Sequence, residues 1–518
     1  MPYLLVSLCC LFATLGSFLF GYDSGVISSV IDQDSFKLRF HNPSDAATGG
    51  IVASYNGGAI LGSVVVSYIS DPWGRRPVLF TGGLLASLGA ALQAGAANVA
   101  MLVVGRLIAG VAVGLMSAII PVYCSELSPS RIRGFLGSLQ QWMIGLGVVV
   151  AQWVGYGCSL RTGAFSWSFP LAFQAVPAVI LSVGIWFLPE SPRWLVEKGD
   201  MDTARAILNR LHLVDGQSNA QLVESEFTQI CDSIAEERRS AVRSWRQLLL
   251  TQPSWRRRVL LACGMQVFTQ CSGTNVISNY NPGLYETLGL TQSTSLIIQG
   301  IWGALAQFWN TIFILFIDRV DRRKLLIPSL LGMGASMCVE AILGQVYGNF
   351  ENASASNPSA IRAAIGMFFL FSLFYTSLGL ISWIYQSEIF PTAIRARGSS
   401  VATATNWSLN LIFAQCTPIA RSRIEFNYFY CFAAFNWAAA IIVWVAYPET
   451  AGKSLEEVER LFSPDHLPSP HQEKVSYLSP SQSSVEGKDI LTIVSTQDGT
   501  RAPNHKLTVN AVSVGKRE

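Results

Sequence analysis

The sequence predicts an all-α polytopic membrane protein with twelve transmembrane helices, arranged as two similar six-helix halves. Half of the 518 residues are apolar and only 13% are charged, whereas soluble proteins carry about 25% charged residues. Apolar stretches of about 20 residues, the length that crosses a bilayer as a helix, recur along the chain. Charged motifs of the first half also return in the second. The near balance of 36 basic and 33 acidic residues suggests no nucleic-acid partner.

The expected helices form two sets of six. The first set is 4–27, 49–69, 78–96, 102–124, 136–157 and 169–189. The second set is 258–280, 294–317, 325–347, 361–384, 399–421 and 428–446. The first stretch has no basic segment before it and no small-residue cleavage site, so we expect it to be retained as a helix.

These sets divide the chain into four expected parts. They are an N-terminal six-helix half (1–189), a charged helical linker (190–257), a C-terminal six-helix half (258–447) and a tail (448–518). The tail is rich in Ser, Pro, Gln and Lys, so we expect a short helix at 454–461 followed by disorder.

The orientation is predicted from basic residues in the short loops, which are more frequent on the side that holds the linker. We therefore expect the linker, the tail and both termini in the cytoplasm, with the plasma membrane as the location. The sequon at Asn352 would then lie outside, where it can be glycosylated.

Three motif pairs recur in the same order in the two halves. A charged motif follows the second helix of each half, an acid and an arginine seven residues apart follow the fourth, and a Pro-Glu motif ends the sixth. The pairs are 71–76 with 318–323, Glu126 and Arg133 with Glu388 and Arg395, and 189–191 with 448–450. This order indicates a parallel internal repeat, with a site expected near the membrane midplane between the halves.

With these motifs the chain resembles the sugar-porter family of the major facilitator superfamily, and its long tail is similar to that of fungal members. The resemblance covers about residues 4–462. Further matching segments are 20–25, Gly105-Arg106, 189–195, 383–391 and Asn406-Trp407. It implies a secondary transporter that moves a monosaccharide by alternating access, works as a sugar:proton symporter and needs no cofactor. It also implies a monomer that is not an enzyme.

The resemblance assigns the repeated charges to a cytoplasmic gate. In the family these acids and arginines pair across the halves when the transporter is open to the outside, although charges at this side also act as orientation signals. The matching residues are Asp71, Arg75, Arg76, Glu126 and Arg133 in the first half and Asp318, Arg322, Arg323, Glu388, Arg395 and Glu449 in the second. Pro72 replaces a usual Arg and Asp321 a usual Gly, which would weaken the network.

Ionisable residues inside the spans are functional candidates because they are costly in a membrane. Asp23 and Arg106 both lie toward the outer half of their helices. In proton-coupled family members an Asp at this position takes the proton and pairs with an Arg, but some fungal facilitators also keep the Asp. The pair could instead be structural. Glu340, in the ninth span, matches no family motif, and we expect a lateral structural role or a snorkelling position for it.

The resemblance places five side chains at the sugar-binding site: Gln141, Gln270, Asn275, Trp383 and Asn406. Gln266 is a sixth candidate because it lies one helical turn before Gln270. Amides suit sugars because each hydroxyl can donate and accept a hydrogen bond. Helix–helix bonding is the alternative role for any one of them.

The pocket also departs from the family, since Thr269 and Ala306 each replace an amide and Leu380 replaces a Pro. The alternative function is therefore a facilitator or exporter of another polar solute, such as a polyol, a cyclic acid or a secondary metabolite. A non-transporting nutrient receptor is a third hypothesis, suggested by the tail.

Overall fold

The computed structural model describes residues 4–129, 133–211, 213–214, 217–218, 220–240, 253–287, 289–317, 320–347, 358–390, 392–451 and 455–462. Asp318, the sequon at Asn352 and the tail beyond 462 lie outside these residues, as do the side chains of Arg133 and Arg395.

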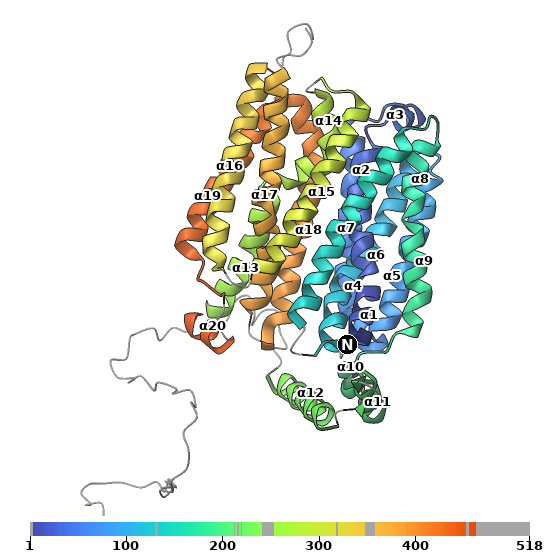
Figure 1. The fold of residues 1–518 in the computed structure, drawn as a ribbon, viewed down its shortest axis with the longest axis vertical. Coiled ribbons are helices and arrows are strands. Elements are labelled where there is room, and N and C mark those ends of the chain that lie inside the picture. The colour runs from blue at the N-terminus through green and yellow to red at the C-terminus, as the bar shows by residue number, and fades with distance from the viewer. Residues whose placement is uncertain are drawn as a thin grey trace, which may run out of the picture. The chain divides into compact units, whose positions relative to one another are not determined.

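The first half is a helical bundle (Figure 1). Its helices are α1 (Leu4–Ala13), α2 (Leu15–Val30), α3 (Asp34–Arg39), α4 (Asp45–Trp73), α5 (Arg75–Ala94), α6 (Val99–Leu127), α7 (Arg133–Ser159), α8 (Phe165–Phe173), α9 (Ala175–Gly184) and the 3-10 turn η1 (Ile185–Phe187).

A small module follows, with α10 (Pro192–Lys198), α11 (Met201–Leu211), the antiparallel strands β1 (Leu213–Val214) and β2 (Gln217–Ser218), and α12 (Ala220–Ser240). It has its own apolar core, which includes Leu195, Leu208 and Phe227.

The second half repeats the helical pattern. It contains α13 (Pro253–Cys271), α14 (Thr274–Thr287), α15 (Gln292–Phe316), α16 (Arg322–Tyr347), α17 (Pro358–Glu388), α18 (Thr392–Ile424), η5 (Glu425–Asn427), α19 (Tyr428–Ala446) and α20 (Leu455–Phe462). Helix α20 matches the short helix expected at 454–461, shifted by one residue.

Ten stretches of the described residues are long and apolar enough to cross a membrane, and one of them, Arg397–Ala446, holds both α18 and α19. Helices α13 and α14 are outside these ten. Helix α13 begins near three arginines, 256–258, and carries buried Gln266 and Gln270, while α14 has only 14 residues. The seventh predicted span therefore lies in none of these ten stretches.

Each predicted span lies in helical structure, but three that were expected to be continuous are interrupted. The first is divided at Thr14 and the sixth at Gln174. The seventh is divided at Gly273, which has a φ of 95°, a conformation that disfavours any residue with a Cβ. A Cβ there would also lie 2.7 Å from the Met337 side chain.

Helices α4 and α6 pack through glycines spaced four apart on both sides, Gly58 with Gly62 and Gly110 with Gly114. A Cβ on Gly110 would lie 2.0 Å from the Tyr55 carbonyl oxygen, and one on Gly58 would lie 2.1 Å from the Leu107 carbonyl oxygen. Such paired glycines let two membrane helices approach closely, which strengthens their van der Waals contact.

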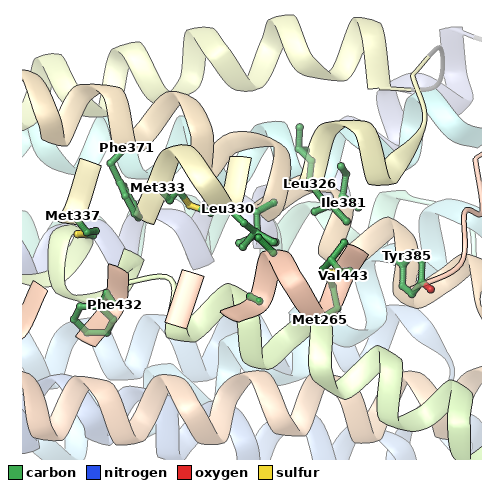
Figure 2. Packing of buried hydrophobic residues seen from close by; sticks show 14 of the residues in the cluster. Met265, Leu326, Leu330, Met333, Met337, Phe371, Ile381, Tyr385, Phe432 and Val443 are labelled. Atoms are coloured by element: carbon green, nitrogen blue, oxygen red, sulfur yellow. The ribbon is translucent and has the colours of Figure 1, made fainter. Parts of the chain in front are cut away.

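The core of the second half follows a stripe of apolar residues on α16. Leu326, Leu330, Met333 and Met337 recur every three or four residues and so share one helix face. They meet side chains of α13, α17 and α19, as Figure 2 shows for Met265, Phe371 and Val443. This packing holds the broken α13–α14 segment against continuous helices.

Gly110→Ala should lower the free energy of unfolding by about 1–3 kcal/mol, because the new methyl group would meet backbone atoms of α4 that cannot rotate away. The apparent Tm of the purified protein in detergent measures this. Gly366→Ala, on α17, is the matched control, since a Cβ there meets nothing within 4 Å. Equal Tm values for the two variants would contradict the close α4–α6 packing.

Candidate functional site

The bundle has two ends, which carry different polar contacts. We call the end beside α10–α12 the linker end and the end that carries α3 and the last residues of α14 the far end (Figure 1). Buried polar side chains lie between them. Each region is described in turn.

At the linker end, two glutamates cap two helices in the same way. Glu190 accepts hydrogen bonds from the backbone N–H groups of Arg75 and Arg76, at 3.1 and 3.2 Å. Glu449 accepts from those of Arg322 and Arg323, both at 3.0 Å. A carboxylate is favourable there because the first N–H groups of a helix are unpaired and carry partial positive charge.

Gly74 makes the first of these caps feasible. Its φ is 92°, and a Cβ there would lie 2.8 Å from a carboxylate oxygen of Glu190. Glycine therefore serves both the turn between α4 and α5 and the approach of the acid.

The arginine side chains of the two caps form matching ion pairs. Arg75 donates through Nε and Nη2 to the two carboxylate oxygens of Glu126, both at 2.9 Å. Arg322 pairs with Glu388 at 3.0 Å, whose other oxygen accepts from the Thr450 hydroxyl at 2.6 Å. Among the described side chains, each of these two ion pairs lies within one half.

The remaining predicted gate residues are more peripheral. Arg76 bonds the Trp186 carbonyl, as Arg323 bonds that of Trp444. Asp71 is exposed and contributes its carbonyl oxygen, which accepts from the Trp194 indole at 2.8 Å. The added acid Asp321 pairs with Lys324 at 2.6 Å.

Asp23 on α2 and Arg106 on α6 form an ion pair inside the first half. Their side chains are 3.2 Å apart, and the residues are only 4% and 1% exposed. The guanidinium also lies 3.5 Å from the Gln93 amide oxygen and 5.0 Å from the centre of the Tyr55 ring. The sequence-predicted proximity of these two charges is thus present in the structure.

In the second half, predicted amides lie in two hydrogen-bonded groups. Asn406 on α18 donates to Gln266 on α13 at 2.7 Å. Asn275 donates to Gln270 at 2.5 Å across the break between α13 and α14. All four are buried, so their amides are placed by neighbouring helices.

Two predicted residues do not join these groups. Gln141, on α7 of the other half, is partly buried, and Trp383 on α17 is 37% exposed. Next to Gln141, Trp142 donates from its indole to Thr311 on α15 at 3.1 Å, so this part of α7 faces the second half.

Sequence reasoning missed Gln386, which connects the larger group. Its amide oxygen accepts from Gln266 at 2.9 Å, and its amide nitrogen donates to Thr403 and to the Ser399 carbonyl, both at 3.1 Å. Gln386 therefore links α13, α17 and α18. Its two-residue distance from Glu388 is the one sequence signal that could have drawn attention to it.

Other polar contacts cross between the halves. Gln299 on α15 donates to the Ser28 hydroxyl on α2 at 2.6 Å. Asn56 on α4 donates to Asn410 on α18 at 3.0 Å. Three helix pairs also pack across the halves and hold them together: α2–α14, α4–α18 and α7–α15.

The far end also joins the halves. Lys37 pairs with Glu286 at 3.9 Å, and Gln292 donates to the Asp32 carbonyl at 3.0 Å. Burial raises the pKa of the Asp32 carboxyl, against the opposing effect of Arg421 and Lys37. Burial likewise raises the pKa of Glu286. Both shifts show that acids at this end are partly withdrawn from water.

We expect Asp23→Leu to destabilise the protein more than Arg106→Leu. An arginine keeps its charge, so Arg106 without Asp23 leaves a buried cation, at a cost of about 3–5 kcal/mol. Asp23 without Arg106 can bind a proton and become neutral, which limits the cost to about 1–3 kcal/mol. Thermal unfolding in detergent gives the order, and the double variant should recover part of the loss. The opposite order would contradict this electrostatic description.

Comparison with known proteins places this geometry in a family. Residues 9–462 match the family described as Sugar (and other) transporter. The chain is 36% identical to the MFS-type transporter criB of Aspergillus cristatus, over 89% of this chain and 94% of that protein. It is 33% identical to a high-affinity glucose transporter of Kluyveromyces lactis, over 88% and 84%.

The fold is similar to that of the MFS proton:xylose symporter XylE bound to 6-bromo-6-deoxy-D-glucose. The TM-score is 0.73 at 27% identity, and the match covers 89% of this chain and all of the other. The inward open conformation of XylE from E. coli matches with a TM-score of 0.71. The family match spans both helical bundles and the polar groups between them, so the chain is a multi-pass membrane protein of the Sugar (and other) transporter family with the all-helical MFS fold.

Proposed function

We propose that this protein transports a monosaccharide across the membrane by alternating access, coupled to protons. The observation that carries the proposal is the buried Asp23–Arg106 pair in one half, together with the buried amides that converge in the other. Relatives named as a glucose transporter and a proton:xylose symporter support the substrate class and the coupling.

The amides suit the substrate class. Gln266, Gln270, Asn275 and Asn406 offer both donors and acceptors, as sugar hydroxyls require. They lie on α13, α14 and α18, and α14 and α18 pack against the first half through α2 and α4. A sugar bound at them, with Gln141 on the opposite half and Trp383 beside them, would contact both halves, as alternating access requires.

The buried pair suits proton coupling. Burial favours the neutral carboxylic acid, whereas the guanidinium 3.2 Å away favours the carboxylate. A small change in the separation of Asp23 and Arg106 would therefore change proton affinity. Tyr55 on α4 lies against Arg106, and α4 contacts α18 of the second half, which gives a physical route from the amides to the pair.

The charged clusters and the far-end contacts suit a gating role. Here the far end joins the halves, while the described linker-end pairs stay within each half. We propose that this arrangement opens toward the linker end, and that the linker-end clusters meet across the halves when the far end opens. The charge bias of the loops supports a cytoplasmic linker end in a plasma-membrane protein.

One observation favours a second candidate, a facilitator or exporter of another polar solute. The Thr269 hydroxyl, where the family has an amide, donates to the carbonyl of Met265 in its own helix at 2.9 Å. With Ala306 also lacking an amide, a sugar would lose two partners. A less hydroxylated solute such as a cyclic acid, or a smaller one such as a short polyol, would lose less.

Uptake of labelled glucose, fructose, galactose and xylose in a yeast strain without hexose transport tests the proposal. We expect uptake that a protonophore abolishes and that Asp23→Asn also abolishes, because the variant cannot bind the proton. Uptake unaffected by both changes would show a facilitator. No sugar uptake by a surface-localised protein would refute the sugar assignment and direct the same assay to polyols and cyclic acids.

Gln386→Leu should raise the KM for the transported solute about tenfold, because Gln266 and Asn406 lose the group that orients them, a loss of about 1.4 kcal/mol. The maximal rate should change less than the KM. Gln174→Leu, a buried glutamine at the α8–α9 break, is the control and should leave the KM unchanged. An unaltered KM in Gln386→Leu would remove Gln386 from the binding site.

A further inference from the structure

Glu340, on α16, is an acid that the transport site does not use. The residue is 1% exposed, which contradicts the snorkelling position expected from the sequence. Neither carboxylate oxygen has a hydrogen-bond partner among the described residues. An ionised carboxylate without a partner is very unfavourable in such surroundings, so the site requires something more than the side chains that surround it.

Helix α14 begins beside α16 near Glu340, because a Cβ on Gly273, the residue before α14, would lie 2.7 Å from the side chain of Met337, three residues before Glu340. The Glu340 carboxyl interacts with the Tyr285 side chain, and the Asn281 amide lies beside the Tyr285 hydroxyl. Both residues are fully buried. The Tyr285 hydroxyl and both polar atoms of Asn281 complete no hydrogen bond with the described residues. Glu340, Asn281 and Tyr285 are thus three buried polar side chains with unfilled hydrogen-bonding capacity.

No described cation balances the acid. Helix α16 packs against α17 and α19 as well as η5. Helix α19 contains no charged residue, and α17 has charges only at exposed Arg362 and at Glu388, which pairs with Arg322 at the linker end. Glu425 is the charged residue of η5 and is itself exposed. No charged side chain of α17, α19 or η5 is therefore buried beside Glu340, and Tyr285 on α14 is a titratable group that interacts with it electrostatically.

A proton resolves this imbalance. The neutral acid has no charge to bury, and it adds an O–H donor that an Asn281 or Tyr285 oxygen can accept, while its carbonyl oxygen accepts in return. We propose that Glu340 is a second proton-binding site of this protein, separate from the Asp23–Arg106 pair, with Asn281 and Tyr285 as its partners. One proton from water binds the carboxylate, and no other bond changes.

The position of α14 gives this site a consequence for transport, which rests on the proposed alternating access. Helix α14 begins after the Gly273 break, contacts α2 of the other half and carries Glu286, which pairs with Lys37 at the far end. Opening the far end requires α14 to leave α2. That movement would separate Asn281 and Tyr285 from Glu340 and admit water, in which the carboxylate is stable.

Glu340 would then hold its proton while the far end is closed and release it when the far end opens. Low pH would favour the closed far end, because a proton that binds one state more tightly shifts the population toward that state.

Infrared spectroscopy of the purified protein tests the proton directly, without any transported solute. We expect a protonated-carboxyl C=O band at neutral pH that Glu340→Gln removes and Asp23→Asn retains. Tyr285→Phe should keep the band but shift its frequency, because a hydrogen-bond partner is lost; this variant serves if Glu340→Gln does not fold. A band unchanged in Glu340→Gln and Tyr285→Phe would overturn the proposal. Loss of the wild-type band on adding sodium chloride would also overturn it, in favour of a sodium site.

Solute exchange in proteoliposomes tests the consequence. Exchange moves no net proton, so Asp23→Asn, whose neutral side chain resembles the protonated acid, should still exchange solute although it cannot take it up with protons. In this background we expect the exchange rate to fall about tenfold from alkaline to acid pH as the far end becomes harder to open. Adding Glu340→Gln, which stays neutral, should make the rate low and nearly independent of pH. The far-end acids Asp32 and Glu286 are common to both proteins. Equal pH dependence in the two would show that Glu340 does not control the far end, whatever the substrate.

Discussion

A polar group in the hydrocarbon layer has no water to bond, so it needs a partner within the protein, and this requirement explains most of the structure. Asp23 has Arg106, and Gln266 has Asn406 and Gln386. Where helices begin at the membrane edge, Glu190 and Glu449 pair the first N–H groups of α5 and α16. Glu340 has no hydrogen-bond partner among the described residues, and a bound proton would remove its charge.

The two halves repeat not only sequence motifs but also the polar contacts that these motifs make. At the linker end, each half has an arginine that pairs with an acid on its fourth membrane span, α6 or α17, and a glutamate that caps a helix. The ion pairs of the two halves have similar lengths, and so do the capping hydrogen bonds. The halves differ where the chemistry differs. The first holds the ion pair, and the second holds the amides and the broken α13–α14 segment. This division lets one half bind the proton and the other most of the solute, as the proposed coupling requires.

The fold and the charged residues could be predicted, but the amide contacts could not. Apolar runs of bilayer length and the repeated Arg-Glu motifs indicate the helices and the family, and a charge such as Asp23 in an apolar run is conspicuous. The break at Thr14 was missed because the flanking sequence is apolar, whereas the break at Gln174 has a sequence signal in Pro177, which has no N–H to donate to the Phe173 carbonyl. Gln386 was missed, and the snorkelling position considered for Glu340 is wrong, because the sequence does not show whether a polar residue in a helix faces lipid or a neighbouring helix. Which of the two it faces depends on how the helices pack in the folded protein.

The central claim is that the Asp23–Arg106 pair couples a proton to solute movement. It is tested most directly by recording both fluxes at once in proteoliposomes that contain the purified protein and a trapped pH indicator. The account predicts that adding the transported sugar outside, with no other gradient, carries protons inward with it, and that Asp23→Asn carries none. Sugar entry without proton movement in the wild-type protein would contradict it.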